Sequence, residues 1–187
     1  MLARCNQVVF QVTSAKEKVQ GGPDIKQRTN HQGITQRFLA IGLVQHIRHN
    51  TNHLRAEPKA NNIDVIPYGG GTSVVGHINP NASDRPILTI SMAKMNKLIS
   101  LDRESQLARF GAGTPGPEIE AQLKAEGFTL GHFPQSWELS TLGGWVASRS
   151  SGQQSLHYGR IEALFAGGSM ETLKGTMDIP TIPASSA

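Results

Sequence analysis

Three consecutive glycines, Gly69–Gly71, are the feature that most restricts how this chain can fold. They follow an apolar run at 63–66 that ends at Pro67, a pattern typical of a buried strand leading into a tight loop. Glycine lets the backbone approach a ligand closely, and successive amides in such a loop can form a concave nest for phosphate oxygens. Thr72 and Ser73 add hydroxyl donors. Taken alone, the loop is equally consistent with an ordinary glycine-rich turn.

A second loop of small polar residues begins about 70 residues later. It runs from Pro134 to the glycine pair Gly143-Gly144, and the segment 147–152 adds more small donors and one arginine. A dinucleotide carries two phosphates, a sugar chain and a flat ring, so it needs several loops that converge from different parts of a chain. The loop at 67–73 matches neither the phosphate-binding loop of nucleoside triphosphatases nor the Rossmann fingerprint. The two loops together therefore favour a dinucleotide site of another kind.

The remaining pattern of short strands, hairpins and a few helices predicts an α+β fold. Apolar runs indicate strands at 63–66, 87–90, 98–101, 107–110 and 161–166. The strands at 98–101 and 107–110 flank a polar turn and are expected to form a hairpin. A further helical or turn segment is expected at 145–152.

One helix is well marked by its ends. Pro115 and Pro117 announce its start, and Gly127 is its natural stop. Ile119 and Leu123 lie on one face of this helix, while Glu120 and Lys124 lie on another.

Residues 1–60 show no regular pattern apart from a short helix expected at 38–47. They carry most of the excess positive charge, but the basic residues are scattered, so we expect no nucleic-acid partner. The sequence shows neither a signal peptide nor an apolar run long enough to span a membrane. Cys5 is the only cysteine, so no intrachain disulfide can form and a reducing compartment such as the cytoplasm fits best.

From about Ile63 to Ala187 the chain resembles alkylglycerone-phosphate synthase and its bacterial FAD-linked oxidase relatives. The matching stretches are IDVIPYGGGTSVVGH, LDRESQLARFGAGTPGPEIEAQLKAEGF, GHFPQSWELSTLGGWVASRSSG and YGRIEAL. The resemblance implies a PCMH/VAO-type FAD-binding domain at 61–187. This domain is expected to be incomplete, with a divergent first lobe and without the C-terminal cap domain. Residues 1–60 would then be a basic leader, either a poorly ordered extension or a remnant of the first lobe.

The resemblance also implies which residues contact FAD. The loop around the diphosphate matches Pro67, Tyr68, Gly69, Gly70, Gly71, Thr72 and Ser73. The second flavin-contacting loop matches Gln135, Ser136, Trp137, Glu138, Leu139, Ser140 and Thr141. A third segment and one residue near the flavin match Ser148, Arg149, Ser150, Ser151 and Ile161. Many relatives have Asp where this chain has Gln135; the change removes a charge beside the phosphates but keeps hydrogen-bonding capacity.

Several other candidates carry less weight. Arg149 either pairs with a phosphate or is an ordinary surface arginine. His132 and His157 flank the second loop and either touch the cofactor or lie behind or beside it. Some relatives tether flavin through His or Cys, but no such residue of this chain aligns with a tether, so we expect non-covalent FAD. The spacing of His46, His49 and His53 suits a metal, but no Cys or Asp ligand reinforces them, so no metal site is expected.

For the reaction of the parent enzyme, the resemblance implies exchange of the acyl group of acyl-dihydroxyacetone phosphate for a fatty alcohol in ether lipid synthesis. The flavin would act as an electrophile, with no net redox change. The alternatives are a fragment of an FAD-dependent 2-hydroxy-acid oxidoreductase, acting for example on D-lactate, and a catalytically inactive remnant. The stretch GHFPQSWELSTLGGW favours the synthase. Catalytic residues cannot be assigned; a small-molecule or lipid substrate is expected, a homodimer is left open, and a eukaryotic parent would be peroxisomal.

Overall fold

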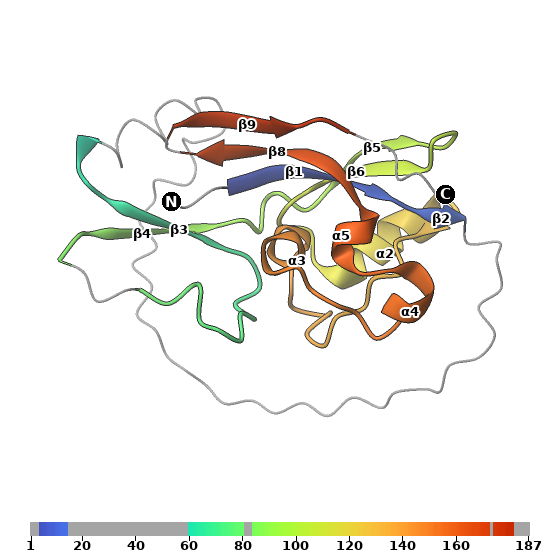
Figure 1. Cartoon of the computed structure of the whole chain (residues 1–187), viewed down its shortest axis with the longest axis horizontal. Helices are drawn as coiled ribbons and strands as arrows, with labels where there is room; N and C mark the ends of the chain where they lie inside the picture. Colours follow the sequence, from blue (N-terminus) through green and yellow to red (C-terminus); the bar gives the residue numbers. More distant parts are fainter. Residues whose placement is uncertain (1–3, 15–59, 81–83, 173, 182–187) are drawn as a thin grey trace.

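The computed structural model describes residues 4–14, 60–80, 84–172 and 174–181. Its largest element is a five-stranded sheet with the strand order β5-β6-β1-β8-β9, in which every neighbouring pair is antiparallel. These strands are β1 Arg4–Gln11, β5 Leu98–Asp102, β6 Leu107–Gly111, β8 Phe165–Thr172 and β9 Gly175–Ile179. The helices gather on one face of this sheet, as Figure 1 shows: α2 Gly116–Ala125, α3 Leu142–Ser148, α4 Ser155–Tyr158 and α5 Ile161–Leu164. The expected α+β architecture is confirmed.

Two smaller sheets complete the described fold. The strands β3 Asp64–Tyr68 and β4 Ile87–Ser91 pair in parallel and lie to one side of the main sheet (Figure 1). The short strands β2 Thr13–Ser14 and β7 Phe128–Thr129 pair antiparallel. The glycine loop leaves the carboxyl end of β3, so this small sheet positions the first of the two loops.

The central strand β1 was not expected from the sequence. It pairs with β6 on one side and β8 on the other, although about 95 and 155 residues separate it from those partners. Residues 4–11 therefore lie within the main sheet, and residues 13–14 pair with β7. The boundary between a leader at 1–60 and an FAD-binding domain at 61–187 stays a prediction. The helix expected at 38–47 and the three histidines His46, His49 and His53 lie outside the described residues.

Most expected elements are confirmed, and two need correction. The strand expected at 161–166 is wrong over its first four residues: Ile161–Leu164 form helix α5, and β8 begins only at Phe165. The reason is that Ile161 and Leu164, three apart, bury the same helical face. The segment expected at 145–152 forms a helix that begins and ends earlier, at 142–148, because Arg149 takes the left-handed conformation with φ 52°.

The core lies between the main sheet and the helices. Phe10 from β1 and Phe165 from β8 meet edge to face, with ring centroids 6.1 Å apart. Ile119 and Leu123 of α2 are both buried in this core, as their shared face predicts. Glu120, on another face of α2, is also buried and only 3% exposed.

Candidate functional site

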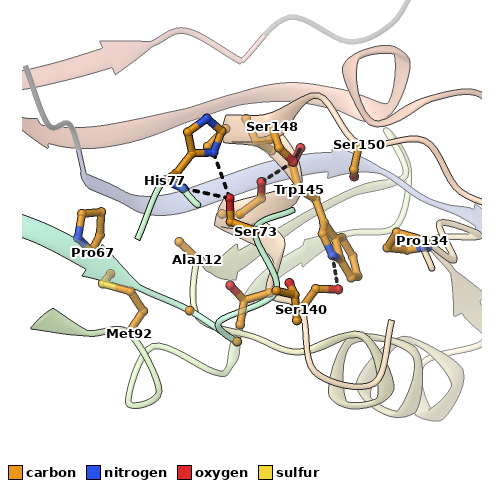
Figure 2. Close-up of a pocket in the computed structure, with 18 of the residues that line it drawn as sticks. Pro67, Ser73, His77, Met92, Ala112, Pro134, Ser140, Trp145, Ser148 and Ser150 are labelled. Carbon is orange, nitrogen blue, oxygen red and sulfur yellow. Dashed lines mark hydrogen bonds between the residues drawn. The ribbon is translucent and has the colours of Figure 1, made fainter. Parts of the chain in front are cut away.

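A cavity of about 960 Å³ lies where the small sheet, α3 and the β8–β9 edge of the main sheet meet (Figure 2). Residues from several parts of the chain form its wall: the loop after β3, the loop before α3, α3 itself, β8 and the end of β9, together with Met92 just after β4 and Ala112 just after β6. Its volume is at the upper end of the range for small-molecule sites, about 300–1,000 Å³. The cavity therefore has room for a ligand of dinucleotide size.

The two loops singled out in the sequence pack directly against each other. A Cβ atom on Gly69 would lie 2.2 Å from the Thr141 Oγ1 atom. A Cβ on Gly70 would lie 1.6 Å from the backbone oxygen of Leu139. Side chains at these two glycines would force the loops apart, so glycine here is a requirement of loop docking as well as of ligand approach.

The last glycine of the run explains where Tyr68 lies. Gly71 has φ +73°, a conformation that residues with side chains rarely adopt, and a Cβ there would meet the Tyr68 hydroxyl oxygen at 2.4 Å. The Tyr68 side chain therefore packs against its own loop. Tyr68 is absent from the cavity wall among the described residues, unlike Pro67 before it.

The second loop is fixed to the main sheet by backbone hydrogen bonds. The Leu142 amide donates to the Thr114 carbonyl at 3.0 Å, and the Gly143 amide donates to the Ala112 carbonyl at 2.8 Å. Thr141 also forms an isolated antiparallel bridge with Pro115. The start of α3 is therefore anchored to the segment that joins β6 to α2.

Hydrogen bonds within this loop set the direction of Trp145. The Trp145 Nε1 atom donates to the Ser140 Oγ atom at 2.7 Å, and that hydroxyl donates to the Ser136 carbonyl at 2.7 Å. Figure 2 shows Trp145 and Ser140 joined in this way at the cavity wall. Trp137 instead packs over the start of α2, where a Cβ on Gly116 would lie 2.4 Å from its indole ring.

The third predicted segment is divided between the cavity and the surface. Ser148 and Ser150 line the cavity, and the Ser148 hydroxyl donates to the Gly144 carbonyl at 2.8 Å. Arg149 does not line it, because its guanidinium pairs with Glu162 at 3.3 Å. Of the two readings of Arg149, the described geometry favours the surface arginine.

Of the predicted contact residues, those that line the cavity are Pro67, Gly69, Gly70, Gly71, Thr72, Ser73, Gln135, Ser136, Ser140, Thr141, Ser148 and Ser150. Those that do not are Tyr68, Trp137, Glu138, Leu139, Arg149, Ser151 and Ile161. Ile161 is 1% exposed and belongs to the hydrophobic core.

A large part of the wall was not among the predicted contact residues. Pro134, Gly143, Gly144 and Ala147 lie in loop segments that the sequence singled out, although no contact was assigned to them. The missed residues are Val74, Val75, His77, Ile78, Met92, Ala112, Trp145, Val146, Phe165, Gly168, Ser169, Met170 and Ile179. Val74, Val75 and His77 stand in the matched stretch IDVIPYGGGTSVVGH. They would have been found if the contact residues had been assigned up to the end of that stretch. The contributions of β8 and β9 depend on sheet pairing and have no local signal.

The described wall has almost no ionisable side chains. It contains no Asp, Glu, Lys or Arg side chain. Among its described residues, His77 is the one histidine, and there is no cysteine or tyrosine. A charged ligand in the described cavity would be held mainly by backbone amides and hydroxyl groups.

His132 lies behind the wall rather than in it. It is 1% exposed, its Nε2 atom is 2.8 Å from the Ser150 Oγ atom, and its ring meets Trp145 edge to face at 5.1 Å. Burial lowers the pKa of His132 to about 4, against a smaller raising effect from the Glu162 carboxylate. The imidazole is therefore neutral at the pH values where a free histidine begins to take up a proton.

Stability should consequently fall as the solution is acidified through the range in which the unfolded histidine protonates. Above pH 6.5 both states are neutral; below it the unfolded chain binds a proton that folded His132 refuses until about pH 4. We expect the free energy of unfolding to lose about 2 kcal/mol from this group between pH 7.5 and pH 5. Urea unfolding of the native chain and of His132→Phe checks this, with His157→Phe as an exposed control. An unchanged pH slope in His132→Phe would contradict the assignment.

The described residues contain no helix that is both long enough and apolar enough to cross a membrane.

Comparison with known proteins adds an independent line of evidence. Residues 53–177 match the family model described as FAD binding domain. An alkyldihydroxyacetonephosphate synthase of Dictyostelium discoideum is 44% identical over 118 residues, which are 63% of this chain and 19% of the relative. A solved alkyldihydroxyacetonephosphate synthase structure is 42% identical with a TM-score of 0.66, over 68% of this chain and 24% of that chain. A mitochondrial cytochrome-type D-lactate dehydrogenase of Saccharomyces cerevisiae is 27% identical over 80% of this chain and 25% of the relative. The chain thus spans about a fifth to a quarter of the length of these relatives.

Proposed function

The chain belongs to the FAD-binding domain family, and from this premise we propose that the described cavity holds FAD without a covalent bond. The single observation that carries the proposal is the docking of the glycine loop on the second loop. A Cβ on Gly70 would fall 1.6 Å from the Leu139 carbonyl oxygen, so the loops can meet only through glycine. Where the two loops meet, the wall consists of backbone and small side chains, which suits the part of a ligand that carries many oxygen atoms.

The residues present fit FAD in size and chemistry. The amides of 69–73 are the proposed partners of the diphosphate, with the hydroxyls of Thr72 and Ser73 as further donors. Apolar wall residues such as Val74, Val75 and Met92 offer surface for flat rings. FAD, when bound, supplies the reactive flavin ring, while the described residues bind and orient it.

One observation supports a non-covalent bond. A covalent tether would use a His or Cys side chain, and His77, the histidine of the described wall, has its Nδ1 atom 3.1 Å from the Ser73 hydroxyl oxygen. Acid precipitation of the yellow complex tests this directly: the flavin is expected in the supernatant, whereas flavin remaining in the washed pellet would contradict the proposal.

For the longer parent protein, we propose synthesis of alkyldihydroxyacetonephosphate. The higher identity of the synthase relatives, at 44% in one case against 27% for the D-lactate dehydrogenase, supports this reaction over oxidation of a 2-hydroxy acid. The 187-residue chain would then supply the FAD site, and other parts of the parent protein would complete the substrate pocket.

Turnover assays separate the alternatives. The purified chain with FAD is supplied either with acyl-dihydroxyacetone phosphate and a fatty alcohol, or with D-lactate and an electron-accepting dye. We expect no turnover by this chain alone with either pair, and ether product from a parent that carries it. Dye reduction by the parent with D-lactate would instead favour the oxidoreductase.

A further inference from the structure

The proposed ligand group is doubly charged, whereas the described cavity wall has almost no charged side chains. The diphosphate of FAD carries two negative charges, yet the wall contains no Lys or Arg, and Arg149 nearby is paired with Glu162. Backbone amides can bind phosphate oxygens but cannot neutralise them. His77 is the wall residue that can become a cation.

His77 is joined to the glycine loop in a specific way. Its backbone amide donates to the Ser73 Oγ atom at 3.2 Å, and its Nδ1 atom lies 3.1 Å from the same oxygen. Figure 2 shows both interactions, with the His77 ring directly above Ser73. One hydroxyl oxygen therefore receives two contacts from a single histidine.

The protonation of the imidazole decides what the Ser73 hydroxyl can do. A hydroxyl has one proton to donate and two lone pairs to accept with. When Nδ1 carries no proton, it accepts the Ser73 proton, and that donor is used up. When Nδ1 carries a proton, as it does in the imidazolium and in one neutral tautomer, Nδ1–H donates to the oxygen, the backbone amide takes the other lone pair, and the hydroxyl proton is free for another acceptor. Only the imidazolium adds a positive charge.

We propose that His77 and Ser73 form an ionisable phosphate contact, in which the protonated imidazole supplies positive charge and releases the Ser73 hydroxyl to donate to the FAD diphosphate. The proposal rests on FAD binding in this cavity. Because a dianionic ligand favours the protonated ring, FAD affinity falls as the pH rises and the imidazole loses its proton.

Other ionisable groups near the cavity do not reproduce this behaviour. On β8 and β9, Glu171 and Asp178 are the neighbouring carboxylates, and neither lines the cavity. The Glu171 carboxylate accepts from the Thr176 hydroxyl at 3.0 Å. Behind α3, burial lowers the pKa of His132 to about 4, so this histidine stays neutral between pH 5.5 and 8.0. A backbone hydrogen bond and, to a smaller extent, the Arg149 guanidinium lower the pKa of Glu162, so this carboxylate keeps its charge across that range.

The test is an equilibrium titration of the full chain with FAD at pH 5.5 and pH 8.0, at one ionic strength. Native affinity is expected to fall about three- to tenfold between the two, which is the range for a partly exposed charge contact. His77→Gln, which keeps hydrogen-bonding capacity but cannot carry charge, should bind at both pH values as the native chain does at pH 8.0. His157→Gln, an exposed histidine outside the cavity wall, should keep the native pH dependence.

Riboflavin, which has the ring system but no phosphate, separates the two parts of the ligand. Its affinity should be the same at pH 5.5 and 8.0, because it offers nothing for the imidazolium to neutralise. If FAD binds but His77→Gln keeps the full native pH dependence, the proposal is overturned while FAD binding stands. If the folded native chain binds FAD at neither pH, it is the proposed function itself that fails.

Discussion

Replacing Gly70 by alanine should lower the affinity for FAD at least about a hundredfold, or about 3 kcal/mol. The added Cβ would lie 1.6 Å from the Leu139 carbonyl oxygen and 3.1 Å from the Ser140 Cα atom, and both neighbours belong to the backbone. A flexible side chain could move aside, but these atoms can yield only if the second loop moves as a whole. Fluorescence titration with FAD measures the loss.

Gly144→Ala is the matched control. Gly144 also lines the cavity, but its added Cβ would find the Thr141 Oγ1 atom at 3.6 Å, an ordinary contact. It lies within α3, where alanine is favoured over glycine by up to about 1 kcal/mol. We expect Gly144→Ala to fold at least as stably as the native chain and to bind FAD within a few-fold of it. Equal affinities of the two variants would show that loop docking through Gly70 is not what forms the site.

Replacing Glu120 by leucine is expected to destabilise the fold by about 3 kcal/mol or more. The buried Glu120 carboxylate accepts from the Leu130 and Gly131 amides, each at 3.1 Å, and from the Thr129 hydroxyl at 2.7 Å. Leucine would leave two buried amides without an acceptor. These amides belong to the segment that leads into the second loop, so FAD affinity should fall together with stability.

Glu120→Gln distinguishes hydrogen bonding from packing. The amide oxygen of glutamine can still accept from the backbone, so this variant should lose only about 1 kcal/mol. Chemical unfolding monitored by circular dichroism compares the two. If leucine were tolerated as well as glutamine, the Glu120 hydrogen bonds would contribute little to holding the loop.

Local patterns in the sequence predicted much of the fold. The hairpin of β5 and β6 needs only two apolar runs and a polar turn, and α2 is marked by prolines at its start and Gly127 at its end. The strand β1 escaped prediction because it has a short apolar centre and both its partners are far away in sequence. The burial of Glu120 could not be predicted, because helical spacing only places it on another face than Ile119 and Leu123 and cannot reveal the acceptors needed by a segment ten residues later.

The site was predictable where it depends on the backbone and less so where it depends on side-chain direction. The glycine loop and much of the second loop lie at the cavity as the sequence indicated. Arg149 and Trp137 lie within matched segments, but neither lines the cavity. The Arg149 guanidinium pairs with Glu162, and Trp137 packs over the start of α2. The walls supplied by β8 and β9 follow only from the pairing of the main sheet.

The most direct test of the account is the flavin content of the purified 187-residue chain. The chain is incubated with FAD, freed of excess by gel filtration, and examined by its visible spectrum and flavin fluorescence. We predict that the native chain and Gly144→Ala each retain about one equivalent of yellow flavin per chain, and that Gly70→Ala loses it. A folded native chain that leaves the column colourless would contradict it.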